Sequence, residues 1–448
     1  MGSHVGNDED KISQLPDALL SHMLSFLLTK DAVRTSILSK RWKNIWASVP
    51  SLDFEHYSCA GFVSFVDRVL YYRDSLDIQR FRLHFKCFPI DVSSIDRWIR
   101  TATSHNVVEL DLCLNFLGGV EFEVPESVFE CKTLVVLKLK SDSSFTYAPP
   151  KLGCFPNLKC LHITIDYPDK DLLEKLFSYF PVLEDLSVEG EWNDHVNCNV
   201  KLFVPKLKRL SINIHSTGYF DEPYEYYFSI DAPKLEFLDL RVDILPSMSF
   251  DNSKSLVKAI VGFYYHPAIM QEHFCDRATK ILAPVSNVEH LSLSAHFLDA
   301  SCIPAFGNLI HLKLVLHDCY RWEVLAELLK KSPNLECLVL EHEQDNNCYP
   351  ENSEDEENAV DQENTEDPWW NCEESAPRCL LSHLKTVLIR GFMGCRDEKQ
   401  AAKYLLKNGA VLEEMTIYVD NVLYSREKLC MEFAHFQRGS MTCRLQLV

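Results

Sequence analysis

The sequence predicts an α/β protein in which a short N-terminal module of three helices precedes a long, irregular solenoid. The solenoid is expected to have a curved parallel sheet on one side and helices and loops on the other. Over residues 10–54 apolar residues recur at helical spacing, and from residue 78 onward the pattern apolar-x-x-apolar-x-apolar recurs thirteen times. A chain of 448 residues also exceeds the size at which one hydrophobic core stops growing, which favours several domains or a repeat array.

The N-terminal module is predicted to hold three short helices. Pro16 suits a first helical turn, because its missing N–H would be unpaired there, and an apolar face follows over residues 19–27. Thr29 can cap a second helix, and Ser39 can cap a third helix that carries Trp42. A segment of about 45 residues rarely buries enough apolar surface to fold alone. Some of this surface must therefore be covered, either by the first repeat or by the helices of a partner.

The repeat pattern has the period of leucine-rich repeats, since successive copies mostly begin 21 to 29 residues apart. The copies begin at Ile78, Val107, Leu134, Leu158, Leu183, Leu207, Leu235, Leu256, Val288, Leu309, Leu335, Leu384 and Leu412, of which the copy at Leu256 is the weakest. The fourth and sixth positions of each copy are expected to be buried, and the third and fifth to face outward. The Asn or Cys common after such strands is mostly missing, so we expect an irregular solenoid.

The segments between the strands carry their own signals. A proline two residues before the pattern marks where the preceding segment ends, at positions 156, 181, 233 and 333. Helices are predicted over Asp169–Tyr179 and Trp322–Lys331, each just before a strand.

The segment 341–376 is strongly acidic, with 14 Asp or Glu residues and no Lys or Arg between Glu341 and Pro377. Such a run repels itself, so we expect a disordered, solvated loop; the functional alternative is a bait for a basic target. The pair Trp369-Trp370 is expected to pack back onto the solenoid. After it, residues 377–448 predict a strand, a glycine turn, an amphipathic helix and another strand, which extend the solenoid.

The formal net charge of −20 opposes binding to a phosphate backbone. The nearest basic stripe, Lys40, Arg41 and Lys43, lies inside the helical pattern, so no nucleic-acid partner is expected. No run of about 18 apolar residues and no N-terminal apolar segment occurs, so neither a membrane span nor secretion is indicated. A cytoplasmic or nuclear location is the default for such a chain.

No chemistry-bearing motif stands out. The 17 cysteines lack paired C-x-x-C spacing and are expected to be free, buried thiols. His311 and His317, with Cys319 nearby, are the metal candidates, but isolated surface histidines are far commoner than ligands, so we expect no metal. Phosphate-binding glycine loops and nucleophile elbows are absent, and we expect neither a cofactor nor an enzyme.

Two segments resemble known domains. The run Ile12-Ser13-Gln14-Leu15-Pro16-Asp17, followed by residues 24–27, 30–42 and Trp46, resembles a plant-type F-box. Residues 377–387, 390–392, 403–408 and 412–417 are similar to the FBD domain of plant F-box/FBD/leucine-rich-repeat proteins. The resemblance implies an F-box at 10–54, a leucine-rich-repeat solenoid at 55–340, the acidic insertion at 341–376 and an FBD domain at 377–448.

The resemblance also implies a partner and a function. The chain would be the substrate-recognition adaptor of an SCF-type (Skp1-cullin-F-box) E3 ubiquitin ligase, in which a Skp1-like protein links it to a cullin-RING ligase. The residues that match the family's Skp1-binding positions are Leu15, Pro16, Leu19, Leu24, Leu27, Val33, Leu38, Ser39 and Trp42. The outward strand positions expected to meet the protein target include Arg80, Arg82, Asp111, Lys138, His162, Arg209, Asp239, His290, His311 and Lys313. In the alternative, the chain is a leucine-rich-repeat interaction scaffold whose F-box-like segment is only a cap.

Overall fold

A computed structural model of the chain describes residues 12, 14–56, 61–73, 77–86, 92–115, 122–141, 145–146, 155–166, 180–192, 199–216, 227–242, 247–251, 254–263, 274–294, 298–316, 322–342, 376–419 and 426–448. The chain forms two compact units, residues 1–192 and 193–448, and each is described by itself.

The first unit begins with the predicted three-helix module. Its elements are α1 (Asp17–Leu24), α2 (Thr29–Arg34), a 3-10 turn (Thr35–Ile37), α3 (Trp42–Ile45) and a second 3-10 turn (Trp46–Ser48). Ser39 is not the N-cap of α3, which is Arg41, although its hydroxyl lies 3.5 Å from the backbone N–H of Trp42. Thr29 does not cap α2. Its buried hydroxyl instead accepts a hydrogen bond from the backbone N–H of Asp53, at 2.7 Å, because α2 lies against the first strand.

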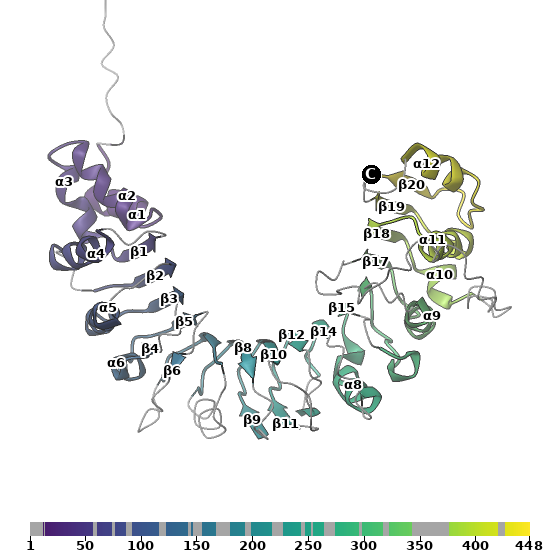
Figure 1. Cartoon of the computed structure of the whole chain (residues 1–448), viewed down its shortest axis with the longest axis horizontal. Coiled ribbons are helices and arrows are strands. Elements are labelled where there is room, and N and C mark those ends of the chain that lie inside the picture. Colours follow the sequence, from purple (N-terminus) through teal and green to yellow (C-terminus); the bar gives the residue numbers. More distant parts are fainter. Residues whose placement is uncertain are drawn as a thin grey trace, which may run out of the picture. The chain divides into compact units, whose positions relative to one another are not determined.

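The rest of the first unit is a parallel sheet with helices on one side (Figure 1). Its strands lie side by side in chain order: β1 (Ser51–His56), β2 (Arg80–Lys86), β3 (Glu109–Asn115), β5 (Val136–Lys140), β7 (Cys160–Thr164) and β8 (Asp185–Trp192). The helices are α4 (Phe62–Tyr71), α5 (Val92–Ser104) and α6 (Glu126–Glu130), and β4 (Phe122–Glu123) pairs with β6 (Phe145–Thr146). Strand β1 is an addition to the thirteen predicted strands, and it uses the last residues of the segment predicted as F-box.

The register matches equivalent positions of successive repeats. Leu110 and Leu112 of β3 pair with Leu137 and Leu139 of β5, and all four side chains are buried. Residues between them, such as Lys138, lie on the opposite face. This alternation confirms the predicted inward and outward positions, because the side-chain period of a strand is two.

The second unit repeats this arrangement. Its main sheet contains β10 (Arg209–Ser216), β12 (Phe237–Val242), β14 (Lys258–Phe263), β15 (His290–Ser294), β16 (His311–Leu316), β17 (Cys337–His342), β18 (Thr386–Phe392), β19 (Glu414–Val419) and β20 (Arg444–Leu447), all parallel. A smaller sheet joins β9 (Asn199–Phe203), β11 (Tyr227–Asp231) and β13 (Ser247–Asp251). The helical segments are α8 (Phe274–Leu282), Pro284–Asn287, Ala300–Cys302, α9 (Trp322–Lys331), α10 (Arg378–Ser382), α11 (Arg396–Asn408) and α12 (Arg426–Ala434).

Several predictions can be compared directly with the second unit. The weakest repeat copy is strand β14, with Ala259 and Val261 buried, and the predicted helix 322–331 is α9. The strand, glycine turn, helix and strand predicted after residue 377 are β18, Gly391, α11 and β19. The predicted helix 169–179, residues 343–375 of the acidic insertion with Trp369 and Trp370, and the metal candidates His317 and Cys319 all lie outside the described residues.

The turns before the strands bind each repeat to the preceding one. The N–H of Leu158 donates to the carbonyl of Phe155 at 3.4 Å, which closes a turn around Pro156. Asn157 reaches back to the carbonyl of Lys132 at 2.9 Å, and Asn334 makes the equivalent bond to Gly307 at 2.7 Å. These asparagines satisfy carbonyls of the preceding repeat, although the position differs from the asparagine of common leucine-rich repeats.

Candidate protein-docking surfaces

The helical module has a small core of its own. Leu20 and Leu24 of α1 pack with Ala32, Trp42, Ile45 and Val49, and Leu15 and Trp46 are half-buried against them. Arg41, just before α3, links this helix to the start of α1. Its guanidinium lies 2.6 Å from the Asp17 carboxylate and also donates to the carbonyl of Leu15. The module therefore reaches its shape without using all of its apolar side chains.

The apolar side chains that remain form a solvent-exposed group, which we call the docking face. Its members are Leu19, Met23, Phe26, Leu27, Leu28, Ile37 and Leu38. Ile37 is 86% exposed, Phe26 77% and Leu38 65%, values unusual for such large apolar side chains. Seven large apolar side chains left exposed within one small folded module favour a protein interaction site, because large exposed apolar surface usually marks one.

The predicted Skp1-binding residues separate into two groups. Pro16, Leu19, Leu27, Leu38 and Ser39 are exposed, and Leu15 and Val33 are half-buried. Leu24 and Trp42, at 3% and 6% exposed, belong to the core of the module, so they hold its shape and cannot present a contact surface.

The sequence-based choice of partner-binding residues left out Met23, Phe26, Leu28 and Ile37, because it kept to the positions that match the F-box resemblance. Adjacent apolar pairs were the available signal. Leu27-Leu28 and Ile37-Leu38 cannot both point into one small core.

A second candidate surface is the exposed strand face, formed by the outward positions of the parallel strands. In the first unit these positions carry alternating charges. Arg82 of β2 lies 3.1 Å from the carboxylate of Asp53 on β1, 3.5 Å from Glu55 and 3.9 Å from Asp111 on β3. His84 completes the network with a 2.9 Å contact to Asp111.

This network changes the interpretation of two predicted target residues. Asp111 is buried, at 8% exposed, and Arg82 is half-buried, so both are engaged within the chain. Burial opposes ionisation of Asp111, but the hydrogen bond from His84 and the charges of His84, Lys138 and Arg82 outweigh it, and the pKa of Asp111 lies below its usual value. Asp111 was predicted as an outward residue, and it does lie on the exposed strand face. Arg82 and His84 contact its carboxylate there, and it is buried.

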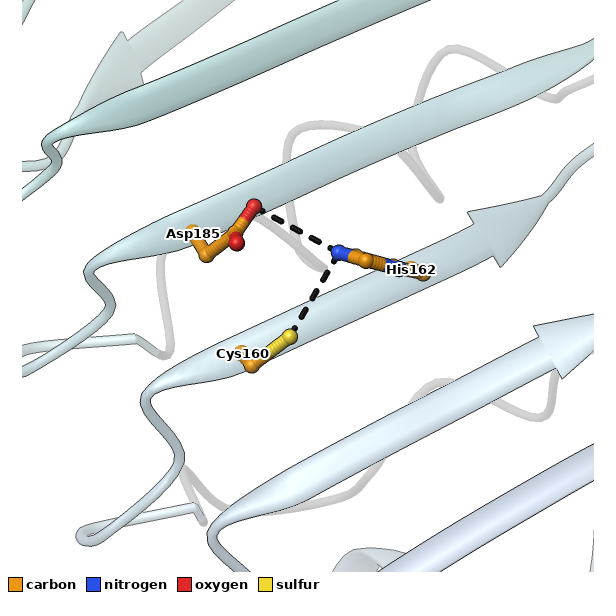
Figure 2. A group of neighbouring side chains, drawn as sticks. All are labelled: Cys160, His162 and Asp185. Atoms are coloured by element: carbon orange, nitrogen blue, oxygen red, sulfur yellow. Dashed lines mark hydrogen bonds and ion pairs between the residues drawn. The ribbon is translucent and has the colours of Figure 1, made fainter.

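The other predicted target residues of the first unit also have partners. Arg80 lies 3.4 Å from Glu109, and Lys138 lies beside Asp111 and His162 in the register of the sheet. His162 contacts Asp185 and Cys160 (Figure 2). Hydrogen bonds to Asp185 and Cys160 raise the pKa of His162 to about 9.

In the second unit the predicted target residues are distributed along four strands. Arg209 is exposed, Asp239 lies 3.0 Å from Arg241, and Lys313 lies 3.0 Å from Glu341. The rings of His290 and His311 stack with their centroids 4.5 Å apart. Burial first, and then the charge of His290, lower the pKa of His311.

A pocket of about 240 Å³ lies where the helical module meets the first repeat. Phe54, Phe62 and Phe65 supply its apolar lining, and Lys30, Asp53 and Glu55 lie at its polar side. It is large enough for a side chain of a bound protein, and it adjoins the charged network of the exposed strand face.

The described cysteines are all free thiols, but they are not all buried as expected. Cys131, Cys302, Cys379 and Cys443 are buried, whereas Cys275 and Cys430 are exposed. No described helix combines the length and the apolar character needed to cross a membrane.

Three family models match the chain. The F-box domain model matches residues 12–54, a model described as the leucine-rich repeats of FBD-associated F-box protein At5g56370 matches residues 95–260, and the FBD model matches residues 373–417. The docking face lies entirely within the first of these matches.

Whole-length relatives occur in Arabidopsis thaliana. The chain is 30% identical to F-box/LRR-repeat protein 13, over 95% of this chain and 94% of that protein. It is also 30% identical to FBD-associated F-box protein At4g10400, over 97% and 99% of the two chains. Putative F-box/FBD/LRR-repeat protein At4g00315 is 31% identical, over 97% and 99%.

Proposed function

Because the chain belongs to the plant family of F-box/FBD/leucine-rich-repeat proteins, we propose that it is the substrate-recognition adaptor of an SCF-type E3 ubiquitin ligase. An F-box adaptor role in general follows from that membership. The proposal adds the two partners: a Skp1-like protein at the docking face, and a protein target at the exposed strand face.

The docking face is the observation that carries the proposal. The module has a complete core in Leu20, Leu24, Trp42 and Ile45, so the exposed Ile37 and Leu38 are not needed for its folding. Apolar side chains that a fold leaves in water gain free energy when a partner covers them. Helices of a Skp1-like protein are the matching partner, because the face is itself made of short helices and turns.

In the proposed role the chain itself forms no covalent bond with the target. It holds a target close to a recruited ubiquitin-loaded enzyme, which raises the effective concentration of target lysines at that enzyme. The docking face and the exposed strand face must then act at the same time. A variant that loses either one should lose ubiquitination of the target.

The direct test is co-expression of the full chain with a Skp1-like protein, followed by affinity purification. Ile37→Asp with Leu38→Asp places charges at the two exposed apolar positions, and we expect binding to weaken by at least about thirtyfold. Met431→Asp is the matched control, because Met431 of α12 is also an exposed apolar side chain, at 69%. Circular dichroism melts should remain within a few degrees of the parent for both variants.

Two results would contradict the proposal. Either the parent chain fails to bind the Skp1-like protein, or the Ile37 and Leu38 double variant binds it as well as the Met431 control does. Leu24→Ala is a useful third variant: it should weaken binding only by destabilising the core of the module, and its melt should reveal that.

The contact between Thr29 and Asp53 favours a second candidate, in which the module serves as a cap for strand β1 and the protein is an interaction scaffold. Deletion of residues 1–54 would remove β1 as well, so the point substitutions discriminate better. If the module were only a cap, Asp at positions 37 and 38 would leave every interaction of the protein unchanged.

For the target surface, we propose the outward positions of the strands, with emphasis on β16 to β18. There Val339 and Leu388 are half-buried apolar side chains on a face that is otherwise mostly polar, and Lys313, Glu341 and Arg390 surround them with charge. Proximity labelling with the Ile37 and Leu38 double variant should capture the target without its destruction. Val339→Asp with Leu388→Asp should abolish that labelling. Arg209→Ala, in β10, tests whether the target also contacts the other end of the strand face of the second unit.

A further inference from the structure

Three side chains with different donor atoms meet on the exposed strand face of the first unit. Cys160 and His162 project from β7, two residues apart, and Asp185 begins the neighbouring strand β8 (Figure 2). Cys160 and Asp185 are directly paired in the register of the two strands. Within the part of the chain that the structure describes, this is the one group of three such residues whose donor atoms all lie within 4.8 Å of one another.

The geometry argues against a nucleophilic triad. In such a triad the histidine uses one ring nitrogen for the nucleophile and the other for the carboxylate. Here the same atom, Nε2 of His162, lies 3.4 Å from the sulfur of Cys160 and 3.4 Å from Oδ1 of Asp185. One nitrogen cannot accept a proton from the thiol while it donates a proton to the carboxylate.

The separations in the metal-free protein are also compatible with a shared metal ion. An N–H···O hydrogen bond normally measures about 2.7–3.2 Å, which is shorter than the separation of His162 and Asp185. In a tetrahedral zinc site, with bonds of about 2.3 Å to sulfur and 2.0–2.1 Å to nitrogen or oxygen, neighbouring ligand atoms lie about 3.3–3.6 Å apart. Both distances from Nε2 fall in that interval.

We propose that Cys160, His162 and Asp185 form a binding site for a divalent ion of the zinc class, with three protein ligands and one open coordination position. A thiolate, an imidazole nitrogen and a carboxylate oxygen suit zinc or cobalt, and they disfavour magnesium and calcium, which prefer oxygen alone. The thiolate and carboxylate together neutralise the charge of the ion. Binding requires that Nε2 and the thiol give up any proton they carry, and these protons pass to solvent.

The strands hold the three ligands in place before any ion arrives. Leu161 and Ile163 of β7 and Leu186 of β8 alternate with the ligands and are buried in the core. The backbone N–H of Asp185 also donates to the carbonyl of Lys159 at 2.9 Å. Ligands on regular, paired strands lose little conformational freedom when they bind, which favours affinity.

The open position faces solvent. The side chains of His162 and Asp185 retain 26% and 19% of their exposure, so an ion bound there can be reached from outside. A water molecule would complete the coordination in the free protein. When a target lies on the exposed strand face, a histidine, cysteine or carboxylate of that target could replace the water and add a metal bond to the contact.

Cobalt titration of the tag-free, full-length chain tests the proposal. After removal of metals with a chelator, we expect one Co²⁺ per chain to give a thiolate-to-cobalt charge-transfer band, which Zn²⁺ then displaces. Cys160→Ser should remove that band, and His162→Gln and Asp185→Asn should each weaken Co²⁺ binding by at least about tenfold. Cys337→Ser is the matched control, because Cys337 also begins a strand on an exposed strand face but is followed two residues later by Val339.

The comparison of Cys160→Ser with Cys337→Ser decides whether the proposal holds. A band that survives Cys160→Ser, or that Cys337→Ser removes equally, would overturn the proposal, as would no binding to the parent tighter than about 1 mM. Circular dichroism spectra of the metal-free variants should match the parent, since the three side chains lie outside the core. Metal binding is measured without any Skp1-like protein, so its failure would leave the proposed adaptor function untouched.

Discussion

Arg82 on β2 and Asp53 on β1 are 29 residues apart in sequence, yet one guanidinium nitrogen of Arg82 lies 3.1 Å from both carboxylate oxygens of Asp53. Each belongs to the same outward position of its repeat, and the parallel register places them directly opposite each other. Glu55 and Asp111 approach the same guanidinium, so one cation serves three carboxylates. Together these charges link the first three strands across their exposed face.

Removal of this cation should destabilise the first unit. Arg82→Met leaves Asp53, Glu55 and Asp111 close together without a counter-charge, and we expect the free energy of unfolding to fall by about 2 kcal/mol. Arg241→Met is the control: Arg241 pairs with Asp239 and its side chain is 48% exposed, so a loss of about 0.5 kcal/mol or less is expected. Urea unfolding measures both, with hydrogen exchange to locate the loss in β1 to β3. Equal losses in the two variants would show that the network is not special.

The lowered pKa of Asp111 predicts how its contribution depends on pH. A carboxyl group whose pKa is lower in the folded state than in the unfolded state stabilises the fold at pH values above its unfolded-state pKa of about 3.9. This contribution is lost as the pH falls through the folded-state pKa. The parent should therefore be about 1 kcal/mol more stable than Asp111→Asn near pH 6. The difference should shrink steadily below pH 4 or so. A difference that stays constant down to pH 2 or so would mean that His84 and Arg82 do not depend on the charge of Asp111.

Gly190 in β8 should tolerate no side chain. Its φ of +151° is rare for other residues, and a Cβ atom would lie 2.1 Å from the carbonyl oxygen of Ile165. Because that obstacle is backbone, Gly190→Ala should cost about 3 kcal/mol or more. Gly307→Ala, where a Cβ would meet nothing within 4 Å, should change the melting temperature by no more than a few degrees. Thermal melts of the two variants that coincide would rule out this strain.

Glu398 of α11 stabilises the turn that connects β18 to α11. Its Oε2 accepts hydrogen bonds from the backbone N–H groups of Met393, Gly394 and Cys395, at 3.0, 2.7 and 3.2 Å, and the residue is only 4% exposed. Glu398→Ala would leave buried donors unpaired, so we expect a loss of about 2–3 kcal/mol, with a smaller loss for Glu398→Gln.

The neighbouring Asp397 supplies the control for this prediction. It is less buried than Glu398 and interacts with the start of α11 mainly as a charge, so Asp397→Ala should cost only about 0.5 kcal/mol. Chemical unfolding of the three variants gives the order. An Asp397 variant as unstable as Glu398→Ala would assign the effect to helix charge and not to the turn.

Much of the repeat architecture could be predicted, because its apolar period is local in sequence. All thirteen predicted copies are strands, including β14 at the weakest copy. Strand β20 shows two alternating apolar residues, Leu445 and Leu447, but the earlier apolar position of the pattern is Thr442. As the last strand, β20 has one neighbour in the sheet, so less apolar surface is required of it. Strand β1 carries the whole pattern in Val49, Leu52 and Phe54, and it was missed because these residues were assigned to the helical module.

The candidate sites depend on packing that a single sequence does not specify. The helical spacing of apolar residues does not decide which of Leu19 and Leu20 points inward, because both fit a helix face. The fold leaves Leu19 half exposed and buries Leu20 completely. The cluster of Cys160, His162 and Asp185 is hidden for a different reason. Asp185 lies one repeat away from Cys160, and only the strand register brings the two together.

The register also has an evolutionary consequence. Each outward side chain meets its counterparts in the two flanking repeats, while the leucine rows behind it pack independently of what the outward residue is. After a gene duplicates, mutations on this face can accumulate one repeat at a time without loss of the fold. Proteins that arise by such duplication can in this way bind different targets while they keep the same N-terminal helical module.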